Sequence, residues 1–150
     1  KKSTYKTIKN GWLHTGDIGT IDNEKYITII GRVNEMIVNS GGENIAPVPI
    51  EESITSFDEI DQVMIYGHNK PYLIALVNPA IEFKNNIKAI KSIINQINLK
   101  LSSEKKIRKF IFVDNPFTIE TGELTPTLKM KRRVIEKKYE KKILNIYSKK

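Results

Sequence analysis

Apolar residues gather in short runs over the first third of the chain, as they do in strands separated by turns. Residues 12–30 are rich in β-branched and aromatic side chains, interrupted by a turn over residues 21–25. Residues 36–38 predict one more short strand, which Ser40-Gly41-Gly42 ends because glycine enters turn conformations at little cost. A short helix is expected from about Pro49 to Ser56, since proline is tolerated in a first helical turn, and Glu51 and Glu52 suit its N-terminal dipole.

Further apolar runs and two helical repeats follow. Residues 62–66 and 72–77 predict strands joined by a hairpin-like connection, and residues 107–113 predict another strand. Apolar side chains recur at helical spacing from Ile87 to Leu101. A final helix is expected from about Arg132, with one apolar face and lysines elsewhere.

These elements predict an α+β fold, a small domain with a short β-hairpin and a three-stranded sheet flanked by helices. Residues 1–31 differ, because their strands offer too few apolar side chains for a core of their own. We expect them to be the edge of a preceding domain. The chain has no apolar stretch long enough to span a bilayer, and its N-terminus has no signal region and no starting Met.

Composition fits one ordinary domain with an attached fragment. The 150 residues are 39% hydrophobic and 28% charged, and the absence of cysteine excludes a disulfide framework and a thiolate metal site. The net charge of +8 is explained most simply by a lysine-rich solvated surface. Attraction of anionic ligands or of an anionic membrane face remains open. Nucleic acid is not expected, because no aromatic-interleaved basic motif is present.

Three blocks in a fixed order carry a resemblance to a known family. They are GWLHTGDIG at residues 11–19, GRVNEMIVNSGGENIAPVPIE at residues 31–51, and LTPTLKMKRR at residues 124–133. The chain resembles the acyl-adenylate-forming enzymes, which include acyl-CoA synthetases, luciferases and peptide-synthetase adenylation domains. The residues in these blocks look most similar to the C-terminal domain of the long-chain fatty acyl-CoA synthetases.

The resemblance implies a domain organisation and a reaction. Residues 1–31 would end the N-terminal adenylation domain, residues 32–35 would be a hinge, and residues 36–150 would form the C-terminal mobile domain. The activity implied is that of an AMP-forming long-chain-fatty-acid–CoA ligase. A fatty carboxylate attacks the α-phosphate of ATP, and the CoA thiol then attacks the acyl-adenylate. The fragment alone is expected to be inactive, because the phosphate-binding loop and the fatty-acid tunnel would lie upstream.

The resemblance also assigns roles to single residues. Lys129 matches the adenylation lysine, whose compact ammonium on a long stem suits the carboxylate and the α-phosphate, and Lys131 is its rival. Leu128 stands where other branches of the family carry glycine. Asp17 matches the aspartate that accepts hydrogen bonds from the ribose hydroxyls, and Arg32 matches the arginine that contacts the nucleotide. A turn-forming aspartate and a surface ion pair are the structural alternatives for these two residues.

Three further residues belong to the mobile parts of the implied enzyme. Asn34 falls at the hinge position, where the family most often has Asp or Lys, and asparagine tolerates unusual backbone angles. Gly41 and Gly42 match the loop that lines the pantetheine tunnel, although a simple tight turn would need the same glycines. No metal site is expected from the two histidines, which are far apart in the sequence.

The implied partners are a fatty acid, ATP with Mg, CoA and the chain's own N-terminal domain, which would hold most of the ATP and Mg. An anionic membrane surface is a further expected partner. The expected location is intracellular and cytoplasmic, with any membrane association arising through the full-length protein. Two alternatives stay open: an acyl-adenylate-forming ligase acting on another acid, and a basic nucleic-acid or membrane-surface binding module, which a steep salt dependence of binding would reveal.

Overall fold

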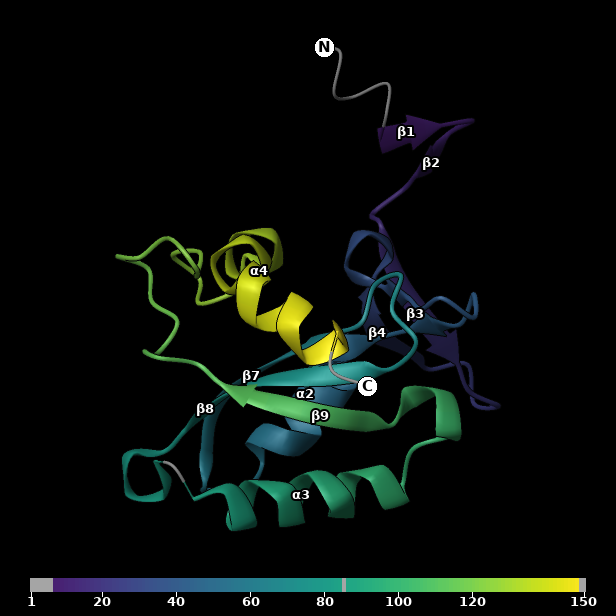
Figure 1. Ribbon diagram of the computed structural model, residues 1–150. Helices are drawn as coiled ribbons and strands as arrows, with labels where there is room; N and C mark the ends of the chain where they lie inside the picture. The colour runs from purple at the N-terminus through teal and green to yellow at the C-terminus, as the bar shows by residue number, and fades with distance from the viewer. Residues whose placement is uncertain (1–6, 85, 149–150) are drawn as a thin grey trace.

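The computed structural model describes residues 7–84 and 86–148. Four short strands open the described chain as two antiparallel hairpins (Figure 1). They are β1 (Ile8–Lys9), β2 (Trp12–Leu13), β3 (Asp17–Ile21) and β4 (Ile27–Arg32). No described residue before Ile37 is buried. These strands therefore have no core of their own, as their composition predicts.

A small hairpin and a helix lead into the main sheet. The 3-10 turn η1 (Val33–Glu35) follows β4, and then come β5 (Ile37–Val38), β6 (Asn44–Ile45) and α2 (Pro47–Thr55). The helix begins at Pro47, two residues earlier than expected. Proline is tolerated there because an N–H group at the first helical position has no hydrogen-bond acceptor within the helix.

The earlier start of α2 corrects the role expected for Glu51. That residue lies beyond the first helical turn and is buried, so it does not serve the N-terminal dipole from an exposed position. Glu52 beside it is exposed.

The main sheet has three strands in the order β7-β8-β9. Their bounds are β7 (Ile60–Tyr66), β8 (Leu73–Pro79) and β9 (Ile107–Phe112). β7 is antiparallel to β8, whereas β9 is parallel to β8, and the crossover between the parallel strands contains η2 (Ile81–Phe83), α3 (Ile87–Leu99) and η3 (Ser103–Lys105). All seven residues of the central strand β8 are buried, which explains its unbroken apolar run.

Helices cover both faces of this sheet, with α2 and α3 on one side and α4 (Arg132–Ser148) on the other (Figure 1). On the first side, α3 buries Ile90, Ile93, Ile94 and Ile97. On the second side, α4 buries Ile135, Tyr139 and Ile143. The predicted α+β architecture is confirmed, although Ile87, placed on the apolar face by its spacing, is exposed.

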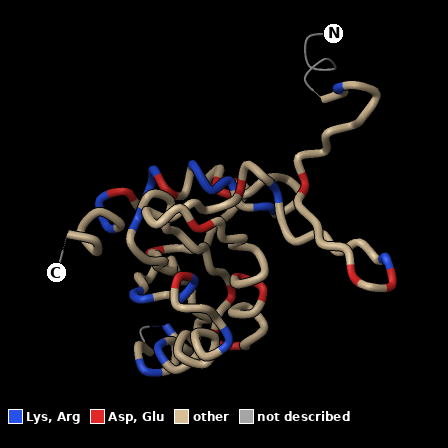
Figure 2. Tube along the Cα trace, turned by 90° about the vertical axis from the view of Figure 1, so that its right-hand side faces the viewer, with Lys and Arg blue, Asp and Glu red and all other residues tan. Residues whose placement is uncertain are grey.

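The charged residues are spread over several elements, including α3 and α4, rather than gathered in one segment (Figure 2). Within the described residues, every helix is too short or too polar to cross a membrane.

Candidate active site

Asp17 and Arg32 face each other across the β3–β4 hairpin. They are paired residues of the two strands, and the Arg32 Nε lies 3.1 Å from the Asp17 Oδ1. Arg32 also donates a hydrogen bond to the Thr15 carbonyl at 3.3 Å, next to Gly16 with its positive φ of 78°. Because the Arg32 and Asp17 side chains are 57% and 36% exposed, their ion pair contributes about 0–1 kcal/mol. The pair can therefore open at little cost, which frees the guanidinium for an acceptor oxygen and the carboxylate for a hydroxyl donor.

The loop that carries Gly41 and Gly42 is organised by Asn39. The buried Asn39 Oδ1 accepts hydrogen bonds from the backbone N–H groups of Gly41 at 2.9 Å and Glu43 at 3.0 Å. Gly42 has a φ of 84°, and a Cβ on Gly41 would lie 3.2 Å from the Asn39 Oδ1. Glycine is therefore favoured at position 42 by its backbone angle, whereas a side chain at position 41 would press on the Asn39 amide.

This loop is attached to the turn that joins β7 and β8. The Ser40 N–H donates to the Lys70 carbonyl at 3.0 Å, and the Asn69 N–H donates to the Val38 carbonyl at 2.8 Å. The His68 Nδ1 accepts a hydrogen bond from the Val38 N–H at 3.3 Å. His68 therefore holds two segments together, and the glycine loop rests on the end of the main sheet.

Lys129 lies directly after the tip of a short hairpin. The Leu128 N–H donates to the Thr125 carbonyl and the Thr125 N–H donates to the Lys129 carbonyl, both at 2.8 Å. This is the pattern of a turn followed by a residue in the left-handed region. Leu128 is that residue, with a φ of 60°, an angle that glycine adopts more easily than a residue with a side chain. Lys129 is exposed, and no described residue binds its ammonium group.

Glu123, at the base of this hairpin, has a fully buried side chain. Its Oε1 lies 2.7 Å from the Lys138 Nζ, and its Oε2 accepts a hydrogen bond from the Thr121 hydroxyl at 2.6 Å. Burial acts to raise the pKa of this carboxyl group, but the Lys138 ammonium and the Thr121 hydroxyl outweigh burial and hold the pKa below its usual range. The Glu123 carbonyl accepts a further hydrogen bond from the Lys131 N–H at 2.7 Å.

Arg132, the first residue of α4, forms a two-pronged ion pair with Glu51 of α2. The Nη1–Oε1 distance is 2.7 Å and the Nη2–Oε2 distance is 2.6 Å. The Glu51 Oε1 also accepts a hydrogen bond from the Ile65 N–H of β7 at 2.7 Å. Burial acts to lower the pKa of Arg132, but its hydrogen bonds to Glu51 and the charges of Glu51, Glu35 and Glu136 raise it. The pair joins α2 and α4 at the β7 edge of the sheet.

The structure brings Asp17 and Arg32 together and leaves the Lys129 hairpin apart from them. In Figure 1 the segment over residues 114–131 lies to the left of α4, and the β3–β4 hairpin lies to its right. Asn34 lies in η1, between β4 and β5. It is not among the described non-glycine residues with a positive φ, so the observed conformation makes no use of its backbone tolerance.

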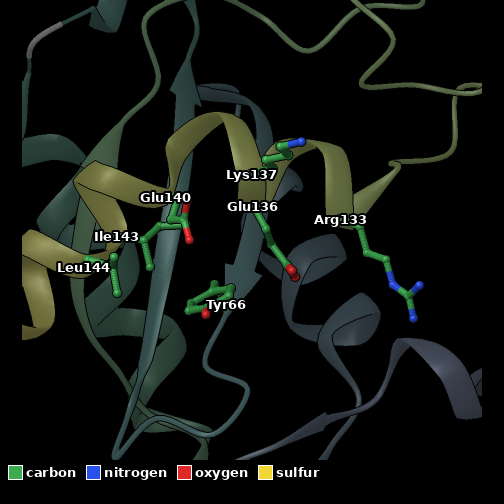
Figure 3. Close-up of a pocket in the computed structure, with 7 residues that line it drawn as sticks. All are labelled: Tyr66, Arg133, Glu136, Lys137, Glu140, Ile143 and Leu144. Atoms are coloured by element: carbon green, nitrogen blue, oxygen red, sulfur yellow. The ribbon is translucent and has the colours of Figure 1, made fainter.

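A pocket of about 260 Å³ lies between α4 and the end of β7. Its lining residues, shown in Figure 3, are Tyr66, Arg133, Glu136, Lys137, Glu140, Ile143 and Leu144. Glu136 and Glu140 extend from α4 on the side of Tyr66, and burial together with these two carboxylates raises the pKa of the Tyr66 phenol. The pocket contains no predicted site residue, and its two acidic side chains balance its two basic ones, so we assign it no catalytic role.

No metal site is formed by the part of the chain that the structure describes. Groups of three or more His, Asp or Glu side chains that could hold a cation do not occur among these residues. We therefore assign no metal-binding role to these residues.

The sequence interpretation missed three buried polar residues that shape the candidate site. Asn39 gave a usable signal, because an asparagine directly before Ser-Gly-Gly is typical of an Asx turn. Glu51 and Glu123 gave none. Their partners lie 81 and 15 residues further along the chain, beyond the reach of any local pattern.

Comparison with known proteins identifies one family and a consistent set of relatives. The family model described as "AMP-binding enzyme C-terminal domain" matches residues 34–150. The long-chain-fatty-acid–CoA ligase FadD15 of Mycobacterium tuberculosis is 34% identical, over 99% of this chain and 28% of that protein. The long-chain-fatty-acid–CoA ligase ACSBG2 of Gallus gallus is 30% identical, over 99% of this chain and 24% of that protein. The chain thus spans about a quarter of the length of these curated relatives.

Solved structures confirm the fold. The adenylation domain of a carboxylate reductase from Mycobacterium chelonae superposes with a TM-score of 0.87 at 24% identity, over 98% of this chain and 25% of that chain. A fatty acyl CoA synthetase from Mycobacterium tuberculosis superposes with a TM-score of 0.58 at 29% identity, over 92% of this chain and 26% of that chain.

Proposed function

Because the chain belongs to the AMP-binding enzyme family and matches its C-terminal domain, we propose that it is the C-terminal part of an AMP-forming long-chain fatty acid–CoA ligase. The observation that carries this proposal is the 34% identity with the ligase FadD15 over 99% of the chain. That match takes in the blocks around Asp17, Arg32 and Lys129, so it covers the residues to which the chemistry is assigned.

We assign residues 1–31 to the end of the N-terminal adenylation domain, residues 32–35 to the hinge and residues 36–150 to the mobile domain. Two observations support this division. The family match begins at residue 34. Trp12, Ile27 and Ile29 are 75%, 68% and 61% exposed, and an apolar surface of this kind is expected to be covered by another domain.

In the first half-reaction, a fatty carboxylate attacks the α-phosphate of ATP and pyrophosphate leaves. The Lys129 ammonium, exposed and unpaired with any described residue, offsets negative charge on the carboxylate and on the phosphate. Asp17 accepts hydrogen bonds from the ribose hydroxyls, and Arg32 binds a nucleotide oxygen. This step requires the Lys129 hairpin to approach the β3–β4 hairpin, which lies on the other side of α4 in the observed arrangement.

In the second half-reaction, the CoA thiol attacks the acyl carbon and AMP leaves. The backbone of Gly41 and Gly42 would lie along the path of the pantetheine arm, because a loop without side chains lets a thin ligand approach closely. Asn39 and the β7–β8 turn fix the position of that loop. We propose that the observed arrangement, with Lys129 withdrawn, serves this second step.

An assay of the full-length protein tests the proposal. We expect long-chain fatty acids to produce AMP and acyl-CoA in the presence of ATP, Mg and CoA, with acid-dependent pyrophosphate release when CoA is omitted. A protein that releases no pyrophosphate with long-chain fatty acids is not this ligase. Release with short, aromatic or amino acids alone would identify another ligase of the same family.

Lys129→Ala tests the assignment of the catalytic lysine. Removal of one such electrostatic group typically costs about 10²–10³ in rate, so adenylate formation should fall by about that factor. Attack of CoA on a supplied acyl-adenylate should be spared, because that step does not use Lys129. Lys131→Ala is the matched control for nearby positive charge. A damaging Lys131→Ala with a mild Lys129→Ala would move the role to Lys131, and equal loss of both half-reactions in Lys129→Ala would make the lysine structural.

A further inference from the structure

We propose that two ion pairs with buried carboxylates, Glu51–Arg132 and Glu123–Lys138, are positioning elements that hold the Lys129 hairpin in the geometry that adenylate formation needs. This inference rests on the proposed function of Lys129. Neither pair touches the reacting atoms in this assignment. Each acts through the backbone that carries the lysine.

The hairpin needs support at its base because little supports its tip. Residues 126–129 are all exposed, and Leu128 at the turn holds a positive φ that disfavours a residue with a side chain. Leu124 and Met130 form an isolated bridge between the two arms, and the Leu128 and Lys129 N–H groups donate to the Thr125 carbonyl and hydroxyl, so these contacts join residues of the hairpin to one another. A lysine at the end of such a loop can be placed accurately only if both arms start from fixed points.

The first fixed point is Arg132, three residues after Lys129. Its guanidinium makes two hydrogen bonds, of 2.7 and 2.6 Å, to the carboxylate of Glu51. Glu51 is itself held by the Ile65 N–H of the main sheet. A planar fork bound at both prongs fixes direction as well as distance, which a single lysine contact would not do.

The second fixed point is Glu123, directly before Leu124. Its carboxylate binds the Lys138 ammonium of α4 and the Thr121 hydroxyl, and its carbonyl binds the Lys131 N–H. Residues 124–131 are therefore flanked by two residues held in ion pairs, Glu123 before them and Arg132 after them. Arg132 and Lys138 both belong to α4, so both ion pairs fix the position of the hairpin relative to this one helix.

Stability alone is a poor explanation for these pairs. A buried ion pair commonly adds no more stability than well-packed apolar residues of similar volume, because two charges must be removed from water. The Glu51 and Glu123 side chains are 6% and 0% exposed, so both carry that cost. Control of the orientation of the lysine loop is a function that apolar residues could not supply.

Glu51→Gln in the full-length protein is the first test. Glutamine keeps the size of the side chain and an oxygen for the Ile65 N–H, but it loses the charge and one prong. Since a displacement of about 1 Å can cost about 100-fold, we expect adenylate formation to fall by about that factor. The attack of CoA on a supplied acyl-adenylate should change less than about twofold, since that step does not use Lys129. The matched control is Asp114→Asn, which removes the exposed 2.6 Å pair with Lys142 of the same helix and should leave both half-reactions unchanged.

A double-mutant cycle with Lys129→Ala separates positioning from general support of the fold. If Glu51 acts through Lys129, Glu51→Gln should cause no further loss in adenylate formation once Lys129 is alanine. Arg132→Lys keeps the charge but not the fork, and it should show the same dependence on Lys129 if Glu51→Gln does not fold. Equal losses with and without Lys129, parallel loss of both half-reactions, or an unchanged rate in both variants would overturn the proposal. A harmless Lys129→Ala would instead overturn the role of the lysine itself.

Discussion

Leu128 holds a φ of 60° at an exposed hairpin tip, a conformation that costs an L-amino acid about 1–2 kcal/mol. Its side chain is 69% exposed and so recovers little of that cost through packing. Glycine adopts the same angle freely, although it loses more conformational entropy on folding, about 0.5–1 kcal/mol. The balance between these two quantities decides the effect of a substitution.

Leu128→Gly should therefore stabilise the chain by up to about 1 kcal/mol. Thermal unfolding of the chain checks this. Leu144→Gly is the matched control, because Leu144 is a half-exposed leucine within α4, where glycine costs about 1 kcal/mol. A Leu128→Gly variant that is as destabilised as the control would show that the leucine is not strained.

Glu123 links stability to pH. Its folded-state pKa is lowered below its usual range, so its contribution is present above the unfolded pKa and is lost as the pH falls through the folded pKa. The stability difference between the wild type and Glu123→Gln should be largest at neutral pH and should shrink below about pH 4.3. Denaturant unfolding across this range is the measurement, with Glu52→Gln at an exposed glutamate as the control. A difference that does not depend on pH would exclude an ionised Glu123 in the folded state.

At this scale, short blocks in a fixed order single out Lys129, Asp17 and Arg32, whose roles stay predictions. The structure shows that Asp17 and Arg32 are neighbours. Glu51 and Glu123 could not be found, because a buried carboxylate is defined by partners that come near it only after folding.

Among the elements, those with a strong local pattern were predicted closely. The repeat of isoleucines in α3 and the unbroken apolar run in β8 correspond to helices and strands with the expected burial. The start of α2 was misplaced by two residues, because Pro47 and Pro49 satisfy the same rule for a first helical turn. The order of the sheet and the parallel pairing of β8 with β9 could not be read from periodicity, which gives the faces of a strand but not its neighbours.

The β5–β6 loop offers a test of an element held by one side chain. Asn39→Ala removes the acceptor for the N–H groups of two exposed residues, Gly41 and Glu43, and each lost hydrogen bond costs about 0.5–1.5 kcal/mol because water can replace the acceptor. We expect a loss of stability in the chain and, in the full-length protein, a larger loss in CoA attack than in adenylate formation. Asn39→Asp keeps the acceptor oxygen and should retain most of both properties. If Asn39→Asp is as damaging as Asn39→Ala, the amide group has a role beyond these two hydrogen bonds.

For the molecule as a whole, the division between residues 7–36 and the rest has a direct consequence for stability. Because no described residue before Ile37 is buried, the first strands add little to the core. A chain of residues 34–150 should unfold within about 3 °C of the full 150 residues. Residues 1–31 alone should show no folded circular dichroism spectrum, since an isolated two-stranded hairpin is marginal in water. A fall of more than about 10 °C in the shortened chain would mean that β3 and β4 are part of the same cooperative unit.

The arrangement of the two bodies was not predictable from the sequence. The boundary near residue 34 follows from short motifs and from the absence of a core before it. β4 meets α2 near Gly31, where an ideal Cβ on that glycine would lie 3.8 Å from the Ala46 Cβ. The angle between the two elements depends on surfaces that have no periodic pattern in the sequence. For the same reason, the separation of the Lys129 hairpin from the β3–β4 hairpin could only be observed.

The position of α4 after the sheet and α3 in the sequence matters during synthesis. Domains form as the polypeptide leaves the ribosome from its N-terminus, so α2, the sheet and α3 can assemble before α4 has been translated. Until then, Glu51 and Glu123 lack the cations that neutralise them, and the face made by Met64, Ile74 and Leu76 stays open to water. A product that stops before Arg132 thus exposes an apolar face and unpaired acidic groups, and exposed apolar surface of this kind makes incomplete chains prone to aggregation.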